Sequence, residues 1–430
     1  MYSVKDKPNK RKGQNVTSPN KKAVILFIDM NSFFASCEQQ ENPVLRGKPI
    51  VVCGGHANGV IIAPSIEAKT FGVKTGMRLK EATLLCPHLF AITPHSNVYR
   101  KYHIGIMNVL RQFSEDVIPK SIDEAVVNLS HYQLIYPDAF KVAREIKEAI
   151  QNQVGEWLQC SIGIAPNTFL AKLATNLQKP NGLVQIHENN IDEILKTLRL
   201  TDLPGIAQRT EKKLIQAGIH SPFTMRHTSP EVLKHIMGGV AGYHWHYRLN
   251  FAEVDLHSSA YKSMSAVRTL SSLQRNNVKV LYEILLALCM KLESRLVHHH
   301  FFAKSIAFQS TYLNQSHWAF HVRLQHPIQD GTDIFKYLKQ KIDLSEKSLQ
   351  RNVFSSDIRK IGVVVNEFIP DTYVQYELFD QNLKRDQLRK TVYHIKELFG
   401  NHKMIKAVEM RETEVLHDII GFGSVKDMIG

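Results

Sequence analysis

The stretch VILFIDMNSFF, residues 24–34, decides the fold of this chain. Its apolar run at residues 24–28 predicts a strand buried on both faces, and the run ends at the carboxylate of Asp29. A second stretch, SIDEAVVNL at residues 121–129, places Asp123 and Glu124 at a polar break before another apolar run. Together the two stretches predict that three acids meet at one edge of a sheet.

Three carboxylates at one sheet edge repel one another and rarely persist unless cations neutralise them. Magnesium suits such a site, because it is usually held by one or two carboxylates together with substrate phosphates. Taken alone, each acid also fits a turn at the end of a strand. The two stretches together favour a metal-dependent site that acts on a nucleotide.

Length and charge narrow the possible functions. A chain of 430 residues is too long for one compact core and suggests about three or four domains. The 54 Lys and Arg outnumber the 40 Asp and Glu, which gives a formal charge of +14 and favours an anionic partner. Nucleic acid is the leading candidate. An anionic membrane surface is the rival, but no apolar run approaches the ~20 residues of a membrane span.

The cysteines and the N-terminal stretch fit a cytoplasmic protein. The five cysteines are scattered without a Cys-x-x-Cys pair, which argues against a zinc knuckle and a disulfide framework. Residues 1–22 are rich in Lys, Asn and Pro and predict a disordered basic tail without the apolar stretch of a signal peptide. The run KRK at residues 10–12 fits a solvated tail better than a nuclear address.

The sequence DMNSFF at residues 29–34, followed by SIDEA at residues 121–125, resembles the palm of the Y-family translesion DNA polymerases. Three further blocks follow in the order of that family: NPVLRGKP at 42–49, FGVKTGM at 71–77 and KPNG at 179–182. The resemblance implies a template-directed polymerase that adds dNTPs to a primer 3′-hydroxyl, tolerates damaged templates and lacks proofreading. It further implies a monomer that works on primer–template DNA in the cytoplasm, associated with the nucleoid.

The expected fold class is α+β and multidomain. Strand and helix patterns in residues 97–187, with the opening strand, give the β-α-β-β-α-β order of a ferredoxin-like sheet. By resemblance this sheet is the palm, accompanied by small fingers, a helical thumb and an α/β little finger. The expected boundaries are a tail at 1–22, palm at 23–36 and 95–187, fingers at 37–94, thumb at 188–258, little finger at 259–370, and a C-terminal tail at 371–430.

The resemblance and the preferences of magnesium assign roles to the acids. Two Mg²⁺ ions would clamp an in-line displacement at phosphorus. Asp29 is expected to bridge them, with the backbone carbonyl of Met30 on the triphosphate-bound ion. Asp123 would be a second bridging ligand, and Glu124 would hold the ion that activates the primer 3′-hydroxyl. Because positioning and charge neutralisation carry such a reaction, no histidine base is needed.

The resemblance also implies residues that bind the nucleotide. Phe33 is expected to pack in the core, whereas Phe34 matches the position whose ring excludes a ribose 2′-hydroxyl. Lys179 matches a lysine that contacts the triphosphate. Plain packing for Phe34 and a solvated turn for Lys179 are the alternatives. Lys172 either reaches phosphate or faces water, and the sequence does not decide between them.

The chain departs from the family in its fingers. Ile66 and Lys69 stand where most members carry a Tyr and an Arg that grip the triphosphate. Lys69 supplies a point charge without the forked grip of a guanidinium, and Ile66 supplies no hydrogen bond. This departure puts nucleotide affinity in doubt.

Contacts to DNA are expected outside the palm. Gly205 and Ala207 lie in a pattern that resembles a helix-hairpin-helix, which aims backbone N–H groups at a phosphate. Ala207 replaces the usual second glycine. In the little finger, the basic and polar residues expected along the duplex backbone are Lys262, Ser263, Arg268 and Lys304. The aromatic run YHWHYR at residues 243–248 favours helix packing over a metal site.

A short peptide beyond the last folded domain predicts a protein partner. The sequence QYELF at residues 375–379 resembles the peptide by which bacterial polymerases dock on the sliding clamp. Gln375, Leu378 and Phe379 would each enter a pocket while the backbone stays extended. Residues 383–400 predict one helix without an assigned role.

Two other functions share part of this evidence. A non-catalytic relative that binds damaged DNA would keep the basic domains, and the departures at Ile66 and Lys69 make that alternative worth testing. A two-metal nuclease would share the acids but would need neither Phe34 nor Lys179.

Overall fold

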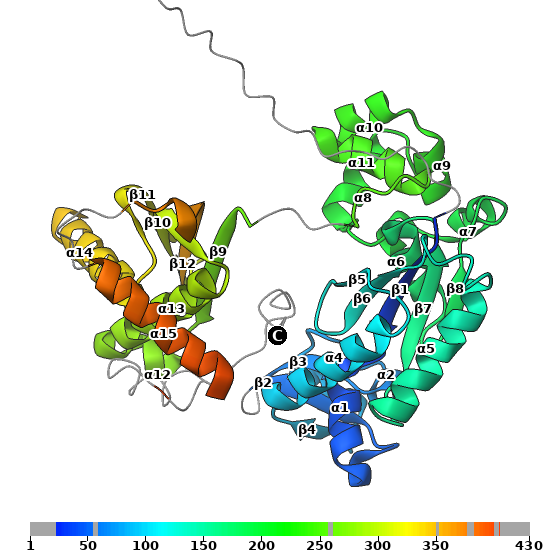
Figure 1. Cartoon of the computed structure of the whole chain (residues 1–430), viewed down its shortest axis with the longest axis horizontal. Helices are drawn as coiled ribbons and strands as arrows, with labels where there is room; N and C mark the ends of the chain where they lie inside the picture. Colours follow the sequence, from blue (N-terminus) through cyan, green and yellow to red (C-terminus); the bar gives the residue numbers. More distant parts are fainter. Residues whose placement is uncertain are drawn as a thin grey trace, which may run out of the picture. The chain divides into compact units, whose positions relative to one another are not determined.

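The computed structural model describes residues 23–54, 59–256, 261–349, 352–375, 382–399 and 404. The chain forms two compact units, which divide between Ser258 and Ser259. Figure 1 labels the elements of both units, and each unit is described by itself.

A five-stranded sheet organises the first unit. Its strand order is β5-β6-β1-β7-β8, with β1 antiparallel to both β6 and β7. The strands are β1 (Ile25–Met30), β5 (Val117–Pro119), β6 (Glu124–Asn128), β7 (Cys160–Ala165) and β8 (Leu183–Gln185). Four of them have the ferredoxin-like order that the sequence predicts, and β8 adds a parallel edge strand beside β7.

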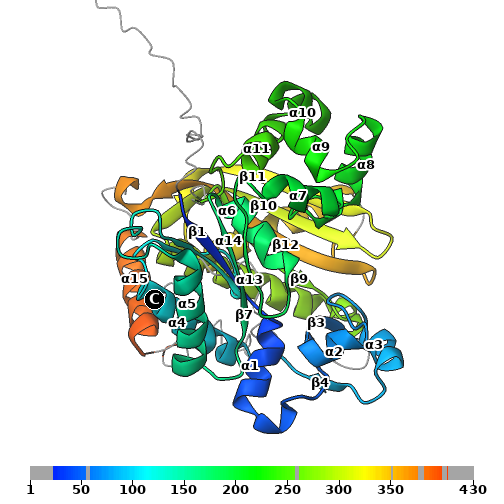
Figure 2. The same ribbon diagram turned by 90° about the vertical axis from the view of Figure 1, so that its right-hand side faces the viewer.

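The central strand β1 is buried on both faces, as its apolar run predicts. Leu26 and Ile28 join the core under α1 (Phe33–Glu41), α4 (Ser96–Arg111) and α5 (Ala139–Gln153). Ile25 and Phe27 join the core under α6 (Thr168–Leu177), on the opposite face. Figure 2 shows these helices around the sheet from a second direction. The strand continues through Asp29 and Met30 instead of ending at Ile28, so Asp29 is a strand residue.

A glycine lets α6 approach the sheet closely. Gly163 on β7 pairs with Phe27, and a Cβ atom there would lie 2.0 Å from the carbonyl oxygen of Ala171 on α6. Any larger residue would push the helix away from the strand. The position of α6 matters because it carries Lys172.

A smaller three-stranded sheet follows α1 and the short helix η1 (Pro43–Leu45). Its strands are β2 (Ile50–Gly54), β3 (Val60–Pro64) and β4 (Phe90–Ile92), in the order β3-β2-β4. The helix α2 (Ile66–Thr70) begins at a Ser65 cap, whose hydroxyl accepts from the N–H of Ala68 at 3.2 Å. A further helix in this stretch is α3 (Leu79–Leu85).

Short helices complete the first unit. They are α7 (Ile191–Thr197), η2 (Leu200–Asp202), α8 (Gln208–Gln216), α9 (Pro222–His227), α10 (Pro230–Met237) and α11 (Val240–Leu249). Trp245 of α11 is buried against Phe169, and the imidazole of His246 bonds to the carbonyl of Thr228. The aromatic run therefore packs helices, as predicted, and within the described residues no His, Cys, Asp and Glu side chains form a metal-binding group.

The second unit is a four-stranded sheet with the order β11-β10-β12-β9. Its elements are β9 (Ser263–Thr269), α12 (Ser272–Arg275), α13 (Val278–His298), β10 (Phe301–Tyr312), β11 (His317–Ile328), α14 (Gly331–Leu349), β12 (Ile358–Pro370) and η3 (Asp371–Tyr373). Three histidines, residues 298–300, end α13 in a turn, with His300 at a φ of 55°.

The C-terminal helix α15 (Asn382–Phe399) packs on α13 through its polar face. Arg389 is buried and donates to Gln329 at 3.0 Å and to Asp330 at 3.2 Å, and it pairs with Asp386 at 2.8 Å. Leu388 is 66% exposed on the outward side. The helix is therefore held by ion pairs and hydrogen bonds, which a search for an apolar stripe does not find.

Two further features concern the cysteines and the hydropathy of the helices. All five cysteines are buried and unpaired. Among the described helices, none has the length and hydropathy of a membrane span.

Candidate active site

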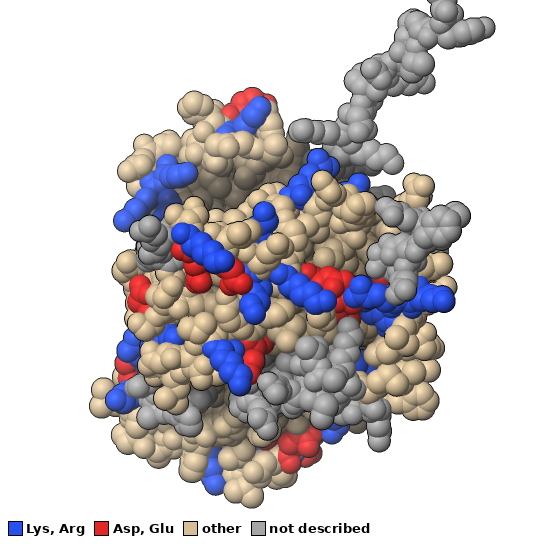
Figure 3. All heavy atoms as spheres, turned by 90° about the vertical axis from the view of Figure 1, so that its left-hand side faces the viewer, with Lys and Arg blue, Asp and Glu red and all other residues tan. Residues whose placement is uncertain are grey.

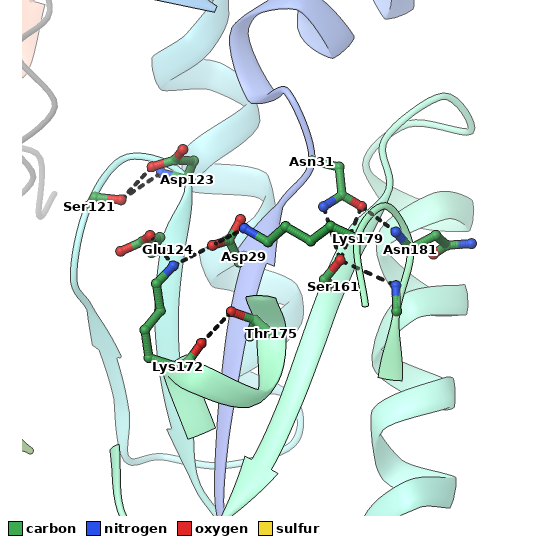
Figure 4. A network of polar contacts seen from close by, with 11 residues as sticks. Asp29, Asn31, Ser121, Asp123, Glu124, Ser161, Lys172, Thr175, Lys179 and Asn181 are labelled. Atoms are coloured by element: carbon green, nitrogen blue, oxygen red, sulfur yellow. Dashed lines mark hydrogen bonds and ion pairs between the residues drawn. The ribbon is translucent and has the colours of Figure 1, made fainter. Parts of the chain in front are cut away.

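Asp29 and Glu124 lie opposite each other at the end of two paired strands. They are partners in the register of β1 and β6, so both side chains lie on the face that α6 covers. Lys172 of α6 bonds to both carboxylates, at 2.5 Å from Glu124, and Figure 4 shows its amine between them. The sheet register and the packing of α6 thus place one cation between the buried Asp29 and the half-buried Glu124.

A second lysine approaches Asp29 from the turn after α6. The Lys179 amine lies 2.8 Å from an Asp29 carboxylate oxygen. Asn31 supports this turn, because its side-chain oxygen accepts from the N–H of Asn181 at 2.7 Å and its amide donates to Ser161 at 3.1 Å. Asp29 is therefore an anion held by two lysines from different segments.

Asp123 lies beside this pair but is held separately. The N–H of Met30 donates to its carbonyl at 2.9 Å, and its carboxylate accepts from the hydroxyl of Ser121. Asp123 lies in the bend just before β6, and the charge of Asp29 acts on its carboxylate. Asp29, Asp123 and Glu124 line one cavity, yet within the described residues no three acids converge as metal ligands.

Burial and charge set the ionisation of these groups. Burial would raise the pKa of Asp29, but Lys172 and Lys179 outweigh it and hold that pKa below its ordinary value. Burial raises the pKa of Asp123, with a further contribution from the charge of Asp29. Burial also raises the pKa of Glu124 despite its bond to Lys172. The lysines thus lower the pKa of Asp29, whereas burial dominates at Asp123 and Glu124 and raises their pKa.

The cavity between the two sheets of this unit has a volume of about 620 Å³. Besides the three acids, its lining includes the lysines Lys69, Lys172 and Lys179, the aromatic residues Phe33 and Phe34, and Ile66. Burial and the charge of Lys179 lower the pKa of Lys69. The residues that the sequence singled out for nucleotide binding therefore lie around one cavity.

Both phenylalanines are buried at the start of α1. Phe34 stacks on Tyr99 with ring centroids 4.2 Å apart and an angle of 12° between the planes. The Tyr99 hydroxyl in turn donates to the buried carboxylate of Glu38 at 2.6 Å. Phe34 is therefore a fixed wall of the cavity, and Phe33, which packs in the core, lines the cavity as well.

The residues expected to contact DNA lie away from this cavity in the chain. Gly205 has a φ of 96°, and Ala207 precedes the first residue of α8, so their turn leads into a helix N-terminus. In the second unit, Lys262 and Ser263 are exposed at the start of β9, and Lys304 is half-buried on β10. Arg268 is half-buried on β9, on the same side of the sheet as the buried residues Met264 and Ala266.

The surface shown in Figure 3 carries mixed charge. Lys and Arg lie beside Asp and Glu there, so this face offers no wholly basic surface to a phosphate backbone. Of the expected clamp-binding residues, Gln375 is exposed, and Leu378 and Phe379 lie outside the described residues.

The sequence alone did not assign a role to Lys172, although its neighbours indicate a charge on a buried helix face. In the helix sequence TFLAKLA, Lys172 is the one charged residue among buried apolar neighbours. A lysine on a buried helix face needs an acid partner, because an unpaired buried charge is costly. The partners themselves, Asp29 and Glu124, follow only from the packing of α6 on the sheet.

The fold and cavity define a multidomain α+β protein whose ferredoxin-like palm presents acids and lysines to a nucleotide-sized space. Residues 28–176 match the impB/mucB/samB family, and residues 261–378 match its C-terminal domain. A DNA polymerase IV of Pelotomaculum thermopropionicum is 30% identical over 92% of this chain and 97% of its own. The DNA polymerase IV 1 of Bacillus subtilis is 28% identical over 92% and 95%.

Solved structures agree on the fold. A Y-family DNA polymerase chimera built from Dbh and Dpo4 aligns with a TM-score of 0.68 at 23% identity, covering 81% of this chain and 99% of that chain. An insertion ternary complex of Dbh DNA polymerase aligns with a TM-score of 0.56 at 24% identity. The chain belongs to the Y family of translesion DNA polymerases, whose members are DNA-directed DNA polymerases.

The pairing of Lys172 with Asp29 has a consequence for stability. Because the folded-state pKa of Asp29 is depressed, its charge contributes stability above the unfolded-state pKa, and the contribution is lost as the pH falls through the folded-state pKa. Lys172→Met is expected to lower the free energy of unfolding at pH 7 by about 1–3 kcal/mol, since it leaves buried acids without their cation. Urea unfolding followed by circular dichroism measures this change.

The difference between this variant and the unaltered protein should shrink as the pH falls from 7 toward 4, because the unpaired carboxylates then take up protons. Lys141→Met removes an exposed lysine of α5 and serves as the control. Equal stability of the Lys172 variant and the unaltered protein at pH 7 would contradict the pairing.

Proposed function

We propose that the cavity binds a deoxynucleoside triphosphate and the primer end, and that the chain joins them by nucleotidyl transfer. In this reaction the primer 3′-hydroxyl gives up its proton to water and its oxygen forms a bond to the α-phosphorus. The bond from that phosphorus to the oxygen bridging to the β-phosphorus breaks, and pyrophosphate leaves. The supporting observation is that one cavity of about 620 Å³ gathers three acids and three lysines. The work of the enzyme is then positioning and charge neutralisation.

The oxygen donors of this cavity are of the chemical kind that magnesium ions prefer. The Asp29, Asp123 and Glu124 carboxylates and the Met30 carbonyl are hard oxygen ligands, and lysine amines already serve as cations beside two of these acids. When bound, the ions would neutralise phosphate charge and activate the primer hydroxyl. Lys172 supplies a positive charge between Asp29 and Glu124 that offsets the repulsion of their carboxylates.

The lysines would bind the phosphates, and the aromatic wall would select the sugar. Lys69 and Lys179 line the cavity and supply positive charge to the triphosphate, although Lys69 lacks the fork of an arginine. Phe34, fixed against Tyr99, would close the space that a 2′-hydroxyl needs. Ile66 adds only apolar wall.

The proposals for DNA and for a sliding clamp rest on the positions and the chemistry of the residues that would contact them. The turn at Gly205 and Ala207, together with Lys262, Ser263, Arg268 and Lys304, would hold primer–template DNA without reading its sequence. The peptide with Gln375, Leu378 and Phe379 would bind a sliding clamp. In the chain this peptide lies between η3 and α15, shortly after β12.

Primer extension with magnesium, dNTPs and a lesion-bearing template tests the function. We expect the unaltered chain to extend the primer and Asp123→Ala to reduce extension by about 10²-fold or more, because a ligand of the reacting centre is lost. DNA affinity, measured by fluorescence anisotropy, should stay within about two-fold, since phosphate contacts dominate it.

Glu145→Ala, which removes a half-exposed acid of α5, is the control for loss of a carboxylate. Shortening of the primer by the unaltered chain would favour a nuclease, and binding without either change would favour a non-catalytic relative. Extension that survives Asp123→Ala would overturn the assignment of that acid.

Sugar selection rests on Phe34. Phe34→Ala is expected to lower the selectivity for dNTPs over rNTPs by about ten-fold or more, because the ring no longer fills the space for the 2′-hydroxyl. The ratio of kcat/KM values for matched nucleotides measures it. Phe90→Ala removes an exposed ring of the smaller sheet and should leave the ratio unchanged. An unchanged ratio in the Phe34 variant would remove this role.

The clamp peptide predicts that clamp binding can be lost without loss of primer extension. The double substitution of Leu378→Ala and Phe379→Ala should abolish retention on an immobilised sliding clamp while leaving extension by the free enzyme unchanged, because both anchors of the peptide are removed. Leu383→Ala, at the exposed start of α15, is the control. Undiminished retention of the double variant would exclude this peptide as the docking site.

A further inference from the structure

Lys120 joins the acidic loop to the end of the first unit. It stands directly before the SIDE sequence, and its backbone N–H donates to the carbonyl of Glu124 at 2.9 Å. Its amine donates to two successive backbone carbonyls, those of Asp255 at 2.7 Å and Leu256 at 2.8 Å. These residues lie 135 and 136 positions further along the chain, so the contact is a long-range one.

The two carbonyls are held in place by an ion pair. Asp255 accepts from the Arg248 guanidinium at 2.7 and 2.6 Å, one bond to each carboxylate oxygen. Such bidentate pairs fix orientation as well as distance. The same guanidinium lies over the rings of Phe169 and Trp245. The carbonyls that accept from Lys120 therefore lie in a segment that this ion pair holds in place, residues 248–256, here called the braced segment.

The braced segment also caps the helix that carries Lys172. Glu253 accepts from both the N–H and the hydroxyl of Thr168, each at 2.7 Å, at the first residue of α6. The buried Asn167 amide donates to the carbonyls of Arg248 at 2.8 Å and Ala252 at 3.0 Å. Residues 248–256 thus hold the start of α6 on one side and Lys120 on the other.

We propose that Lys120 is a positioning residue for nucleotidyl transfer, which clasps residues 255 and 256 and thereby fixes the loop that carries Asp123 and Glu124 relative to α6. Lys120 is not among the described residues that line the cavity, so it acts through the acids that it places. Displacing a reacting group by about 1 Å can cost about 10²-fold in rate. The inference rests on the proposed polymerase function.

Steady-state primer extension by the full chain tests this role. Lys120→Met keeps the length of the side chain but removes its donors, and we expect kcat to fall about ten-fold or more with little change in the KM for DNA. The magnesium concentration that gives half the maximal rate should rise, because the carboxylates are no longer held together. Lys120→Arg, which keeps donors for both carbonyls, should restore most of the rate.

Lys141→Met is the matched control for loss of a palm lysine, and its kcat should stay unchanged. A merely structural role would lower the urea midpoint of Lys120→Met without changing the kcat of the folded fraction, and that result would overturn the proposal. So would an unchanged kcat. Failure of the unaltered chain to extend primers would instead overturn the proposed function, which keeps the two failures distinct.

Asp255→Asn gives an independent route to the same test, because it loosens the acceptors and leaves Lys120 intact. If the clasp acts as one unit, the double variant with Lys120→Met should lose little more kcat than the worse single variant. If the fold-losses in kcat of the two single variants multiply in the double variant, the two residues act separately. That result would contradict the clasp.

Discussion

The bond of Lys172 to Asp29 and Glu124 is the constraint on which the first unit depends. Because β1 is buried on both faces, the largely buried carboxylate of Asp29 at its end needs a cation as a partner. That cation comes from α6, and α6 reaches the strand because Gly163 leaves room for its backbone. The apolar packing of the sheet and the placement of the acids are therefore one arrangement.

The charges around the cavity explain why a triphosphate would need further cations. The lining holds three acids and three lysines, whose formal charges cancel. Lys172 and Lys179 are already engaged with Asp29, so their charge is not available in full to phosphates. Each added phosphate oxygen would leave the site increasingly negative. Divalent ions resolve this imbalance, and carboxylates already lie on the walls to receive them.

Most of the fold could be predicted from sequence, and the limits have physical causes. Periodicity located β1, α4, α5 and α6 because their apolar residues face a core, whereas β11, with half-buried alternate residues, gave a weaker pattern. The meeting of Asp29 and Glu124 followed from two strand ends at one sheet edge. That Asp123 would be held apart by Ser121 depends on the shape of a loop, which side-chain spacing does not encode.

Two charged side chains on buried helix faces carry the information that apolar patterns miss. Lys172 lies among buried residues of α6 and meets the acids of the sheet, and Arg389 lies on the buried face of α15 and meets Asp330 and Asp386. In both helices the cation needs a carboxylate partner, because an unpaired buried charge is costly. The partners of Lys172 come from the sheet, whereas Arg389 pairs with Asp330 and with Asp386, one turn earlier in α15. A buried cation thus specifies which surface its helix must meet, while apolar residues specify only that some surface is met. In α6 that surface is the one where the polymerase acids lie.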